Sequence, residues 1–406
     1  MTVVLQRPYE FVPPFRWGIW PSFIQAFRLI DWHLRRKEGV VEYECRNLGE
    51  FRKCIDRGDG ILLTPNHCRY ADPIVMGWPG REANTHLYAM ASWHLFNTNA
   101  FERFALRRMG AFSIHREASD KQSLDTAIQI LTDAERPLIV FPEGTTNRTN
   151  DLLKPLLDGV AFMARTAAKR RAKRDGGQVV MLPVAIKYLC KDDIRPWADR
   201  ELGKLEQRLG WHKSVKPELV PRTIRLAEGM LALKEIEYTG RSSTGELPPR
   251  RDALMNRLLE QSESDLKLVP DDSDDVRDRV RKIRAEVVGK YFALDESEQP
   301  RQRHRLSLIA DQADFAQNLL SFPDCYLTPG QVTDTRLLET IQRIQESIYG
   351  KATSTMPLKA VVEFGGAIEV PGERAPRGQR DPLMMTLEDA LNSMLEPLSR
   401  EAKSLG

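Results

Sequence analysis

The sequence lacks several features that would place it in a well-defined protein class. Its formal net charge is only +3 over 406 residues, so it has no strong overall field to attract nucleic acid. Its longest apolar runs, such as VVMLPVAI at residues 179–186, are far shorter than the ~20 residues that a membrane-spanning helix needs. The opening stretch, MTVVLQRPYEF, has neither the basic start nor the sustained apolar core of a secretory signal. We therefore expect no nucleic-acid partner, no transmembrane span and no cleaved leader.

Cysteine is also sparse and irregularly placed. The chain has five cysteines, namely Cys45, Cys54, Cys68, Cys190 and Cys325. Their number is odd and none forms a CxxC pair, so the pattern predicts neither a disulfide framework nor a zinc site. A reducing compartment and the absence of a metal are the corresponding expectations.

Strand and helix patterns alternate in the first half of the chain. Strands are predicted at residues 40–45, 61–68, 85–90, 137–144 and 179–189, and helices at 47–58, 121–136 and 154–170. The strands read as nearly continuous apolar runs, which is typical of strands that are buried on both faces. The sequence therefore predicts an α/β fold with a mostly parallel sheet flanked by helices.

Helical patterns replace the strands after about residue 191. One helix is predicted over residues 276–289 with Gly289 as its stop, and another over residues 334–350 with Gly350 as its stop. A single β pattern then returns at residues 357–370, followed by a helix at 386–400. Because an isolated strand has to pair with another, we expect this one to return to the first sheet. The helical region would then be a large insertion before the last strand.

An amphipathic helix is predicted near the N-terminus, starting at Pro21 and Ser22. Its apolar face consists of Phe23, Phe27, Ile30 and Leu34. The neighbouring tryptophan and arginine residues are Trp17, Trp20, Trp32, Arg28, Arg35 and Arg36. From the pattern alone two interpretations are open: a helix docked on the core, or a helix lying in a membrane interface, where indoles and basic residues are both stable.

The stretch NHCRYAD, residues 66–72, directly follows a buried strand pattern. Ligands of open α/β sheets bind at the carboxyl ends of the strands, so His67 is expected at such an edge. Asp72 follows five positions later, where it can orient the ring of His67 and leave the other ring nitrogen free as a base. The alternative is a buried histidine whose hydrogen bonds are satisfied by a helix-capping aspartate.

Three further stretches place polar or special residues after strand patterns. FPEGTTNR, residues 141–148, offers the carboxylate of Glu143 and a turn at Gly144 and Thr145 that suits an anion or a polyol, or else a simple helix cap. GAFSIHRE, residues 110–117, contains a short β pattern that ends at Arg116, which suits a phosphate or else belongs to a solvated basic face. MLPVAIK, residues 181–187, contains Pro183. This proline is expected either to shape an apolar tunnel or to lie in an ordinary core strand.

In sequence order, NHCRYAD, GAFSIHRE, FPEGT and LPVAI resemble the four motifs of the glycerolipid acyltransferases, the lysophosphatidate acyltransferase family. The resemblance covers roughly residues 40–189, and VEFGGAIEV resembles the family's closing strand. It implies four segments. These are a membrane-interface segment at 1–38, an acyltransferase α/β domain at 39–195, a helical insertion at 196–356, and a closing strand and helix at 357–406.

The resemblance also implies a reaction in phospholipid biosynthesis. His67 would act as the general base on a free hydroxyl of a lysophospholipid such as 1-acylglycerol 3-phosphate, with Asp72 orienting it. The hydroxyl oxygen would attack an acyl thioester, on acyl-CoA or acyl carrier protein, without a covalent acyl-enzyme, metal or other cofactor. The remaining site residues would bind the acceptor phosphoglycerol (Arg116, Glu143, Gly144 and Thr145), stabilise the oxyanion (Asn66 and nearby backbone amides) and form the acyl pocket (Pro183).

The sequence departs from the family pattern in two places. Thr146 stands where the family usually has an arginine, and the nearest arginine is Arg148, so the acceptor headgroup is left open. The N-terminal apolar segment is weaker than in the family, which implies a peripheral or monotopic enzyme on the cytoplasmic face of a membrane.

Alternative functions are a thioesterase, a nucleophilic role for Cys68, and a lipid-binding scaffold that works through the helical insertion.

Overall fold

One eight-stranded sheet organises the protein, which is represented here by a computed structural model. The structure describes residues 5–118, 120–174, 176–211, 218–271, 273–294, 300–328, 330–353, 355–373 and 380–405. The strands are Val40–Arg46 (β1), Gly60–Pro65 (β2), Tyr88–Ser92 (β3), Ala111–Ile114 (β4), Leu138–Ile139 (β5), Val179–Cys190 (β6), Leu358–Phe364 (β7) and Ile368–Glu369 (β8). Their order is β1-β7-β6-β2-β5-β3-β4, with β8 beside β6. Only the pairs that β6 makes with β7 and β8 are antiparallel, so the predicted mostly parallel α/β sheet is confirmed.

The late strand returns to the first sheet, as predicted. β7 lies between β1 and β6, where Leu358 pairs with Val40 and Phe364 pairs with Val184. Between β6 and β7 the chain forms the helices Ile194–Arg208 (α9), Leu219–Thr239 (α10), Leu247–Leu266 (α11), Val276–Ala293 (α12), Pro300–Leu319 (α13) and Asp334–Tyr349 (α14). The division into four segments stays a prediction. We refer to residues 196–356 as the helical segment.

The other helices flank the sheet or connect its strands. They are Ile19–Ala26 (α1), Leu29–His33 (α2), Leu34–Glu38 (η1), Leu48–Asp56 (α3), Asp72–Val75 (α4), Gly77–Glu82 (α5), Trp93–Asn97 (η2), Ala100–Arg108 (α6), Lys121–Asp133 (α7), Gly159–Arg174 (α8) and Pro382–Ser399 (α15). Side chains of α7, α8 and α15 share one apolar core with the sheet, and those of α3, α9 and α14 share another.

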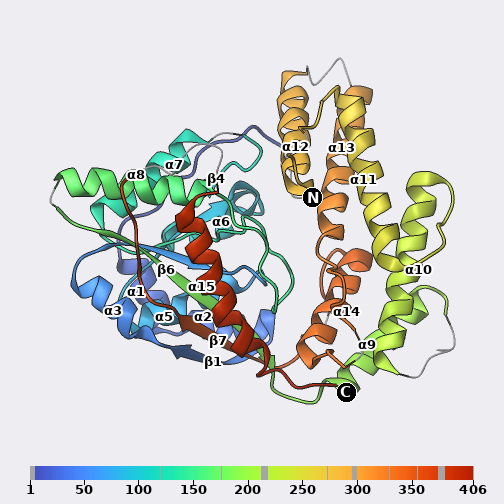
Figure 1. The fold of residues 1–406 in the computed structure, drawn as a ribbon, viewed down its shortest axis with the longest axis horizontal. Helices are drawn as coiled ribbons and strands as arrows, with labels where there is room; N and C mark the ends of the chain where they lie inside the picture. Colours follow the sequence, from blue (N-terminus) through green and yellow to red (C-terminus); the bar gives the residue numbers. More distant parts are fainter. Residues whose placement is uncertain are drawn as a thin grey trace.

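The helical segment divides between two cores. Leu337, Ile341 and Ile344 of α14 are buried in the same cluster as Val184 and Ile186 of β6. Helices α11, α12 and α13 instead pack on one another around a cluster of their own, and they lie side by side away from the sheet (Figure 1). Thus α9 and α14 join a separate helical bundle to the sheet.

The predicted N-terminal helix is not continuous. Arg28 has a left-handed backbone with φ of 51°, which separates α1 from α2. Ile30 and Leu34 are buried in the sheet core, whereas Phe23 and Phe27 are 44% and 65% exposed. The expectation of one continuous apolar face is therefore wrong, because the break rotates the first half away from the core. The core-helix interpretation holds for the half with Ile30 and Leu34, and the membrane-interface interpretation of the exposed half stays a prediction.

The predicted helix ends have different outcomes. Gly350 ends α14 in a left-handed conformation with φ of 73°, as expected of a C-terminal glycine. Gly289 does not end α12, which continues to Ala293. Val288 and Tyr291 on either side of Gly289 pack against the bundle core, and this packing outweighs the ~1 kcal/mol that a glycine costs inside a helix.

Candidate active site

The carboxyl ends of four neighbouring strands form one edge of the sheet. Strands β2, β5, β3 and β4 pair in parallel, so their chains leave the sheet on the same side. His67 follows β2, Glu143 follows β5 and Arg116 follows β4. The topology therefore brings the predicted site residues of three motifs to the edge where α/β proteins bind ligands.

His67 and Asp72 form a direct pair at this edge. His67 Nδ1 lies 2.9 Å from Asp72 Oδ2, and the same oxygen accepts a hydrogen bond from the Arg69 backbone N–H at 2.8 Å. Asp72 is fully buried at the start of α4, and its Oδ1 accepts a hydrogen bond from the Tyr188 hydroxyl at 2.7 Å. Because a carboxylate only accepts, this contact assigns the proton to Nδ1 and leaves Nε2 of His67 as a base.

This geometry agrees with the comparison to known families. Residues 43–187 match the acyltransferase family. The match begins within β1 and ends within β6, so it includes every strand end that carries a predicted site residue. A comparison with curated proteins found no match. The similarity supports a general acyltransferase function for this part of the chain, and the helical segment lies outside it.

Thr146 contacts the free nitrogen of the histidine. Its Oγ1 lies 3.1 Å from His67 Nε2, and the ring of Phe141 stacks on His67 with 4.0 Å between centroids. In the sequence, Thr146 stands out only as a departure from the family pattern. Its hydroxyl occupies the position from which an acceptor hydroxyl would approach the base.

Glu143 holds the histidine loop in place. Its Oε1 accepts a hydrogen bond from the His67 backbone N–H at 2.6 Å, and its Oε2 accepts from Asn147 Nδ2 at 2.7 Å and the Lys154 N–H at 2.9 Å. Burial raises the pKa of Glu143 to about 7, although these hydrogen bonds lower it. Both oxygens are used within the chain, so Glu143 is a positioning residue here, in place of the predicted acceptor contact.

The turn after Glu143 requires a glycine. Gly144 has φ of +72°, and a Cβ at this position would lie 2.4 Å from Leu157 Cδ1. Its N–H is already bound to the Phe141 carbonyl at 3.1 Å. The buried hydroxyl of Thr145, by contrast, has no hydrogen-bond partner among the described residues.

Arg116 reaches the site edge without an anionic partner. It is half-buried, and no hydrogen bond or ion pair joins its side chain to another described residue. Burial lowers the pKa of Arg116 to about 10; Arg284 of α12 adds to this effect, while Glu117 and Tyr70 oppose it. The guanidinium is therefore charged at neutral pH and lies within electrostatic range of Tyr70, three residues after His67.

Two predicted site residues have different surroundings from those expected. The side-chain amide of Asn66 is fully buried and binds both Ile186 backbone groups, at 2.6 Å and 3.1 Å, so it links β2 to β6 instead of facing an oxyanion. Pro183 is buried within β6, and a Cβ on Gly365 would lie 2.8 Å from its Cγ. Pro183 therefore packs against the chain after β7, and its place in an acyl pocket stays a prediction.

Cys68 has the surroundings of an unreactive thiol. It is 1% exposed, and its Sγ lies 3.7–3.8 Å from Asp72 Oδ1, Asn150 Oδ1 and the Ile186 carbonyl. Burial, together with Asp72, raises its pKa well above the ordinary value. A nucleophile needs the thiolate form, so this environment argues against the Cys68 alternative.

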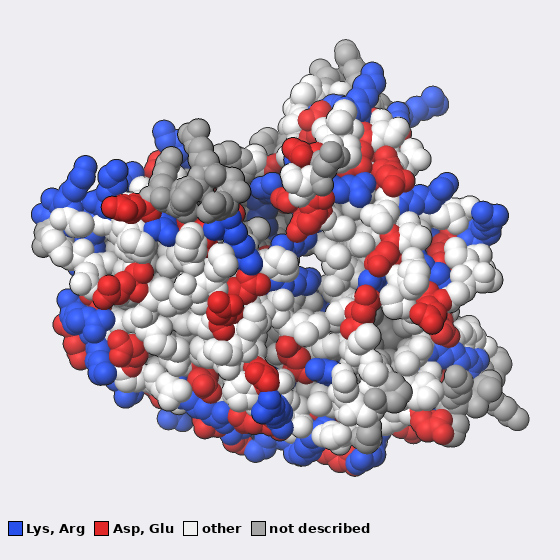
Figure 2. All heavy atoms as spheres, viewed as in Figure 1, with Lys and Arg blue, Asp and Glu red and all other residues white. Residues whose placement is uncertain are grey.

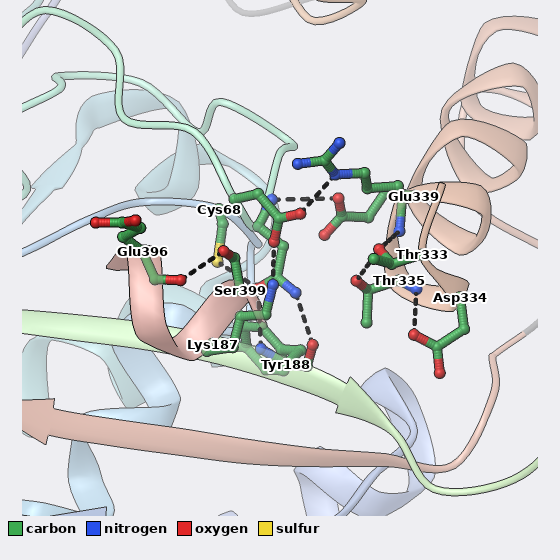
Figure 3. Close-up of polar contacts among 12 residues, drawn as sticks. Cys68, Lys187, Tyr188, Thr333, Asp334, Thr335, Glu339, Glu396 and Ser399 are labelled. Carbon is green, nitrogen blue, oxygen red and sulfur yellow. Dashed lines mark hydrogen bonds and ion pairs between the residues drawn. The ribbon is translucent and has the colours of Figure 1, made fainter. Parts of the chain in front are cut away.

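The helical segment contacts the loop that follows Thr146, which the sequence analysis did not predict. The contacts, which we call the polar junction, are Arg148–Glu346, Arg343–Arg148 carbonyl, Asn150 N–H to Glu339 and Arg336–Asp151. Figure 3 shows Glu339 projecting from α14 above Lys187 and Tyr188 of β6. The polar junction places α14 directly beside the candidate active site.

The described residues contain neither a membrane-spanning helix nor a cluster of metal ligands. Among the described residues, no helix is both long and apolar enough to cross a bilayer. The same residues contain no group of three or more histidine, cysteine or acidic side chains arranged to hold a metal ion.

Proposed function

We propose that this protein transfers a fatty acyl group from an acyl thioester to a free hydroxyl of a lysophospholipid, with 1-acylglycerol 3-phosphate as the acceptor and phosphatidate as the product. The observation that carries the proposal is the His67–Asp72 pair. Asp72 holds the proton on Nδ1 and leaves Nε2 unprotonated beside the Thr146 hydroxyl, which is the arrangement a general base requires. The match of residues 43–187 to the acyltransferase family supports the reaction class.

In the proposed reaction, His67 Nε2 removes the proton from the acceptor hydroxyl as its oxygen attacks the thioester carbonyl. Asp72 stabilises the resulting imidazolium and is itself held by Tyr188 and the Arg69 N–H. The tetrahedral oxyanion collapses, the carbon–sulfur bond breaks, and the thiolate takes the proton from His67. The base is regenerated without a covalent acyl-enzyme or any added cofactor.

Arg116 is the proposed contact for the acceptor phosphate. It is charged and half-buried, and it forms no ion pair or hydrogen bond with another described residue, although Glu117 lies within electrostatic range. A guanidinium binds phosphate through two parallel hydrogen bonds. The unpartnered Thr145 hydroxyl is the proposed contact for the glycerol portion.

The membrane surface is the proposed location, because an aromatic patch is exposed beside the N-terminal helices. The patch consists of Phe15, Trp17, Trp20, Phe23, Phe27, Phe101 and Phe104. Trp17 and Phe101 are 67% and 72% exposed, and Trp20 joins α1 to α6 through an edge contact to Phe104 at 5.5 Å. Arg108 lies 4.2 Å from the Phe15 ring centroid. Indole, phenyl and guanidinium groups together are typical of interfacial binding on the cytoplasmic leaflet.

The test is a coupled assay with long-chain acyl-CoA and lysophosphatidate, which follows thiol release and phosphatidate in the same samples. We expect equal amounts of both products from the wild-type protein and neither from His67→Ala. Thiol release without phosphatidate would overturn the proposal in favour of a thioesterase. Acyl carrier protein as donor and other lysolipids as acceptors are tested in parallel. The absence of thiol release and of lipid product with all of them would overturn the proposed activity.

A further inference from the structure

The exposed and the buried side of the helical segment differ in their polar groups. On the face shown in Figure 2, lysine and arginine atoms are interspersed with aspartate and glutamate atoms over the described residues of this segment. Such mixing offers a charged partner no patch of one sign. On the buried side, in contrast, α14 contacts the loop that carries His67.

Arg69 is a buried arginine in the loop that carries His67. It is 6% exposed, its Nη1 donates to Gln342 Oε1 of α14 at 3.1 Å, and its guanidinium carbon lies 5.2 Å from the centre of the Tyr188 ring in β6. Its Nε has no hydrogen-bond partner among the described residues, and Glu339 of α14 lies within electrostatic range. Burying a guanidinium is costly, and here the charged group joins the His67 loop to both α14 and β6.

Arg69 and Tyr188 also hold Asp72. The Arg69 backbone N–H donates to Asp72 Oδ2, which is the oxygen paired with His67 Nδ1. The Tyr188 hydroxyl donates to Asp72 Oδ1 at 2.7 Å. Burial and the nearby Asp72 charge hold the pKa of Tyr188 well above its ordinary value, so the hydroxyl keeps the proton that it donates. The direction in which Asp72 faces His67 therefore depends on the placement of Arg69 and Tyr188.

Helix α14 fixes the placement of both residues. Gln342 is 4% exposed and accepts the hydrogen bond from Arg69. Asn150 binds both backbone groups of Tyr188, at 2.6 Å and 2.9 Å, and its own N–H donates to Glu339 Oε2 at 3.2 Å. Because Gln342 and Glu339 are three positions apart, they lie on one face of the helix. One face of α14 is therefore connected to both residues.

We propose that Arg69 and Gln342 are positioning residues for the His67–Asp72 base. Through its link to Gln342, Arg69 holds its backbone N–H on Asp72 Oδ2 and keeps the Tyr188 ring in place against its guanidinium. Asp72 then faces His67 Nδ1, and Nε2 is left unprotonated as the base. The inference rests on the proposed acyl transfer. It makes α14, which lies outside the family match, part of the structure that orients the base.

The tautomer of His67 provides the test, because it can be measured without turnover. The protein has seven histidines, so their imidazole rings are labelled with nitrogen-15, and the signal that is lost in His67→Ala identifies the residue. The nitrogen chemical shifts at neutral pH then show which ring nitrogen carries the proton.

Two variants break the link from its two ends, namely Arg69→Met and Gln342→Met. Gln345→Met is the matched control, because Gln345 is 1% exposed on the same helix but donates to Glu201 of α9 at 3.0 Å. Thermal unfolding verifies that each variant is folded, and Gln342→Met decides the outcome if Arg69→Met is not.

We expect a single Nδ1–H tautomer of His67 in the wild-type protein and in Gln345→Met, and a mixture of both tautomers in Arg69→Met and Gln342→Met. In the acyl-transfer assay these two variants should lose about tenfold in kcat with nearly unchanged KM values. A single Nδ1–H tautomer in folded Gln342→Met, or the same mixture in Gln345→Met, would overturn the proposal. The expected tautomers in a protein without acyl transfer would overturn the proposed function and leave the positioning role standing.

Discussion

The sheet and the helical segment bring polar groups to the candidate active site by different means. From the sheet, His67 and Glu143 come from short loops directly after β2 and β5, and they are linked by one hydrogen bond of 2.6 Å. From the helical segment, Glu339, Arg343 and Glu346 recur at helical spacing along α14 and contact the loop at Arg148 and Asn150. Loop residues thus form a compact motif, whereas helix residues contribute one face of a longer element.

The buried charged residues of the sheet side and of the helical segment also differ in how they are paired. Asp72 at the start of α4 is paired with His67 and Tyr188, and Lys187 of β6 is paired with Asp151. Arg343 in α14 keeps two unpaired donors. Removing one partner of a buried ion pair leaves an uncompensated charge and is strongly destabilising, and the following predictions compare such pairs with exposed ones.

The largest effect is expected at the histidine pair. His67→Ala removes the base and Asp72→Asn reverses the preferred tautomer, so each should lower kcat by roughly 10²–10⁴-fold. Steady-state kinetics measures this, and His304→Ala on the exposed face of α13 is the control. A near-normal kcat in both site variants would exclude the proposed mechanism.

The polar junction should contribute strongly to stability. Asp151→Ala leaves the fully buried Lys187 and the partner Arg336 without their carboxylate, which should cost about 3–5 kcal/mol. Urea unfolding gives this value, compared with Glu237→Ala, which removes an exposed pair with Lys234 and should cost at most ~1 kcal/mol. Equal losses in the two variants would show that the junction is not a buried ionic contact.

Stability should depend on pH through Glu143. Its pKa rises from 4.5 to about 7 on folding, so the folded state binds the proton more tightly than the unfolded state. The associated stability is complete below pH 4.5 and is lost as pH rises through about 7, by on the order of 3 kcal/mol. Glu143→Gln should flatten the free energy of unfolding between pH 4.5 and 7, and an unchanged slope would contradict this.

Arg116→Gln should mainly affect acceptor binding. Loss of a charged phosphate contact should raise the KM for lysophosphatidate about 10–100-fold, with a smaller change in kcat. The KM for the acyl donor provides the internal control. If only the donor KM changes, Arg116 has been assigned to the wrong substrate.

The smallest effect is expected at the aromatic patch. The double variant Trp17→Ala and Phe101→Ala should weaken sedimentation with anionic liposomes about tenfold or more, since a large apolar side chain contributes ~1.5–3 kcal/mol on burial. Leu233→Ala, which removes an apolar side chain 55% exposed on α10, should leave sedimentation unchanged. Equal sedimentation of the wild-type protein, the double variant and Leu233→Ala would contradict a membrane-binding role for the patch.

The sequence by itself determined the elements whose pattern is local. The strand runs, the Gly350 helix end and the strand-end positions of His67, Asp72 and Glu143 all depend on neighbours a few residues away. Such positions can be read from periodicity and turn chemistry. The return of β7 was also predictable, because a lone strand requires a partner.

Only the tertiary structure decided which side chains face the site. The side chain of Asn66 binds the backbone of Ile186, and Pro183 packs against Gly365. The left-handed backbone of Arg28 breaks the N-terminal helix. Arg343 reaches the Arg148 loop across 195 positions of sequence. These outcomes depend on how distant elements pack and on which partner satisfies each buried polar group, and no local pattern records that choice.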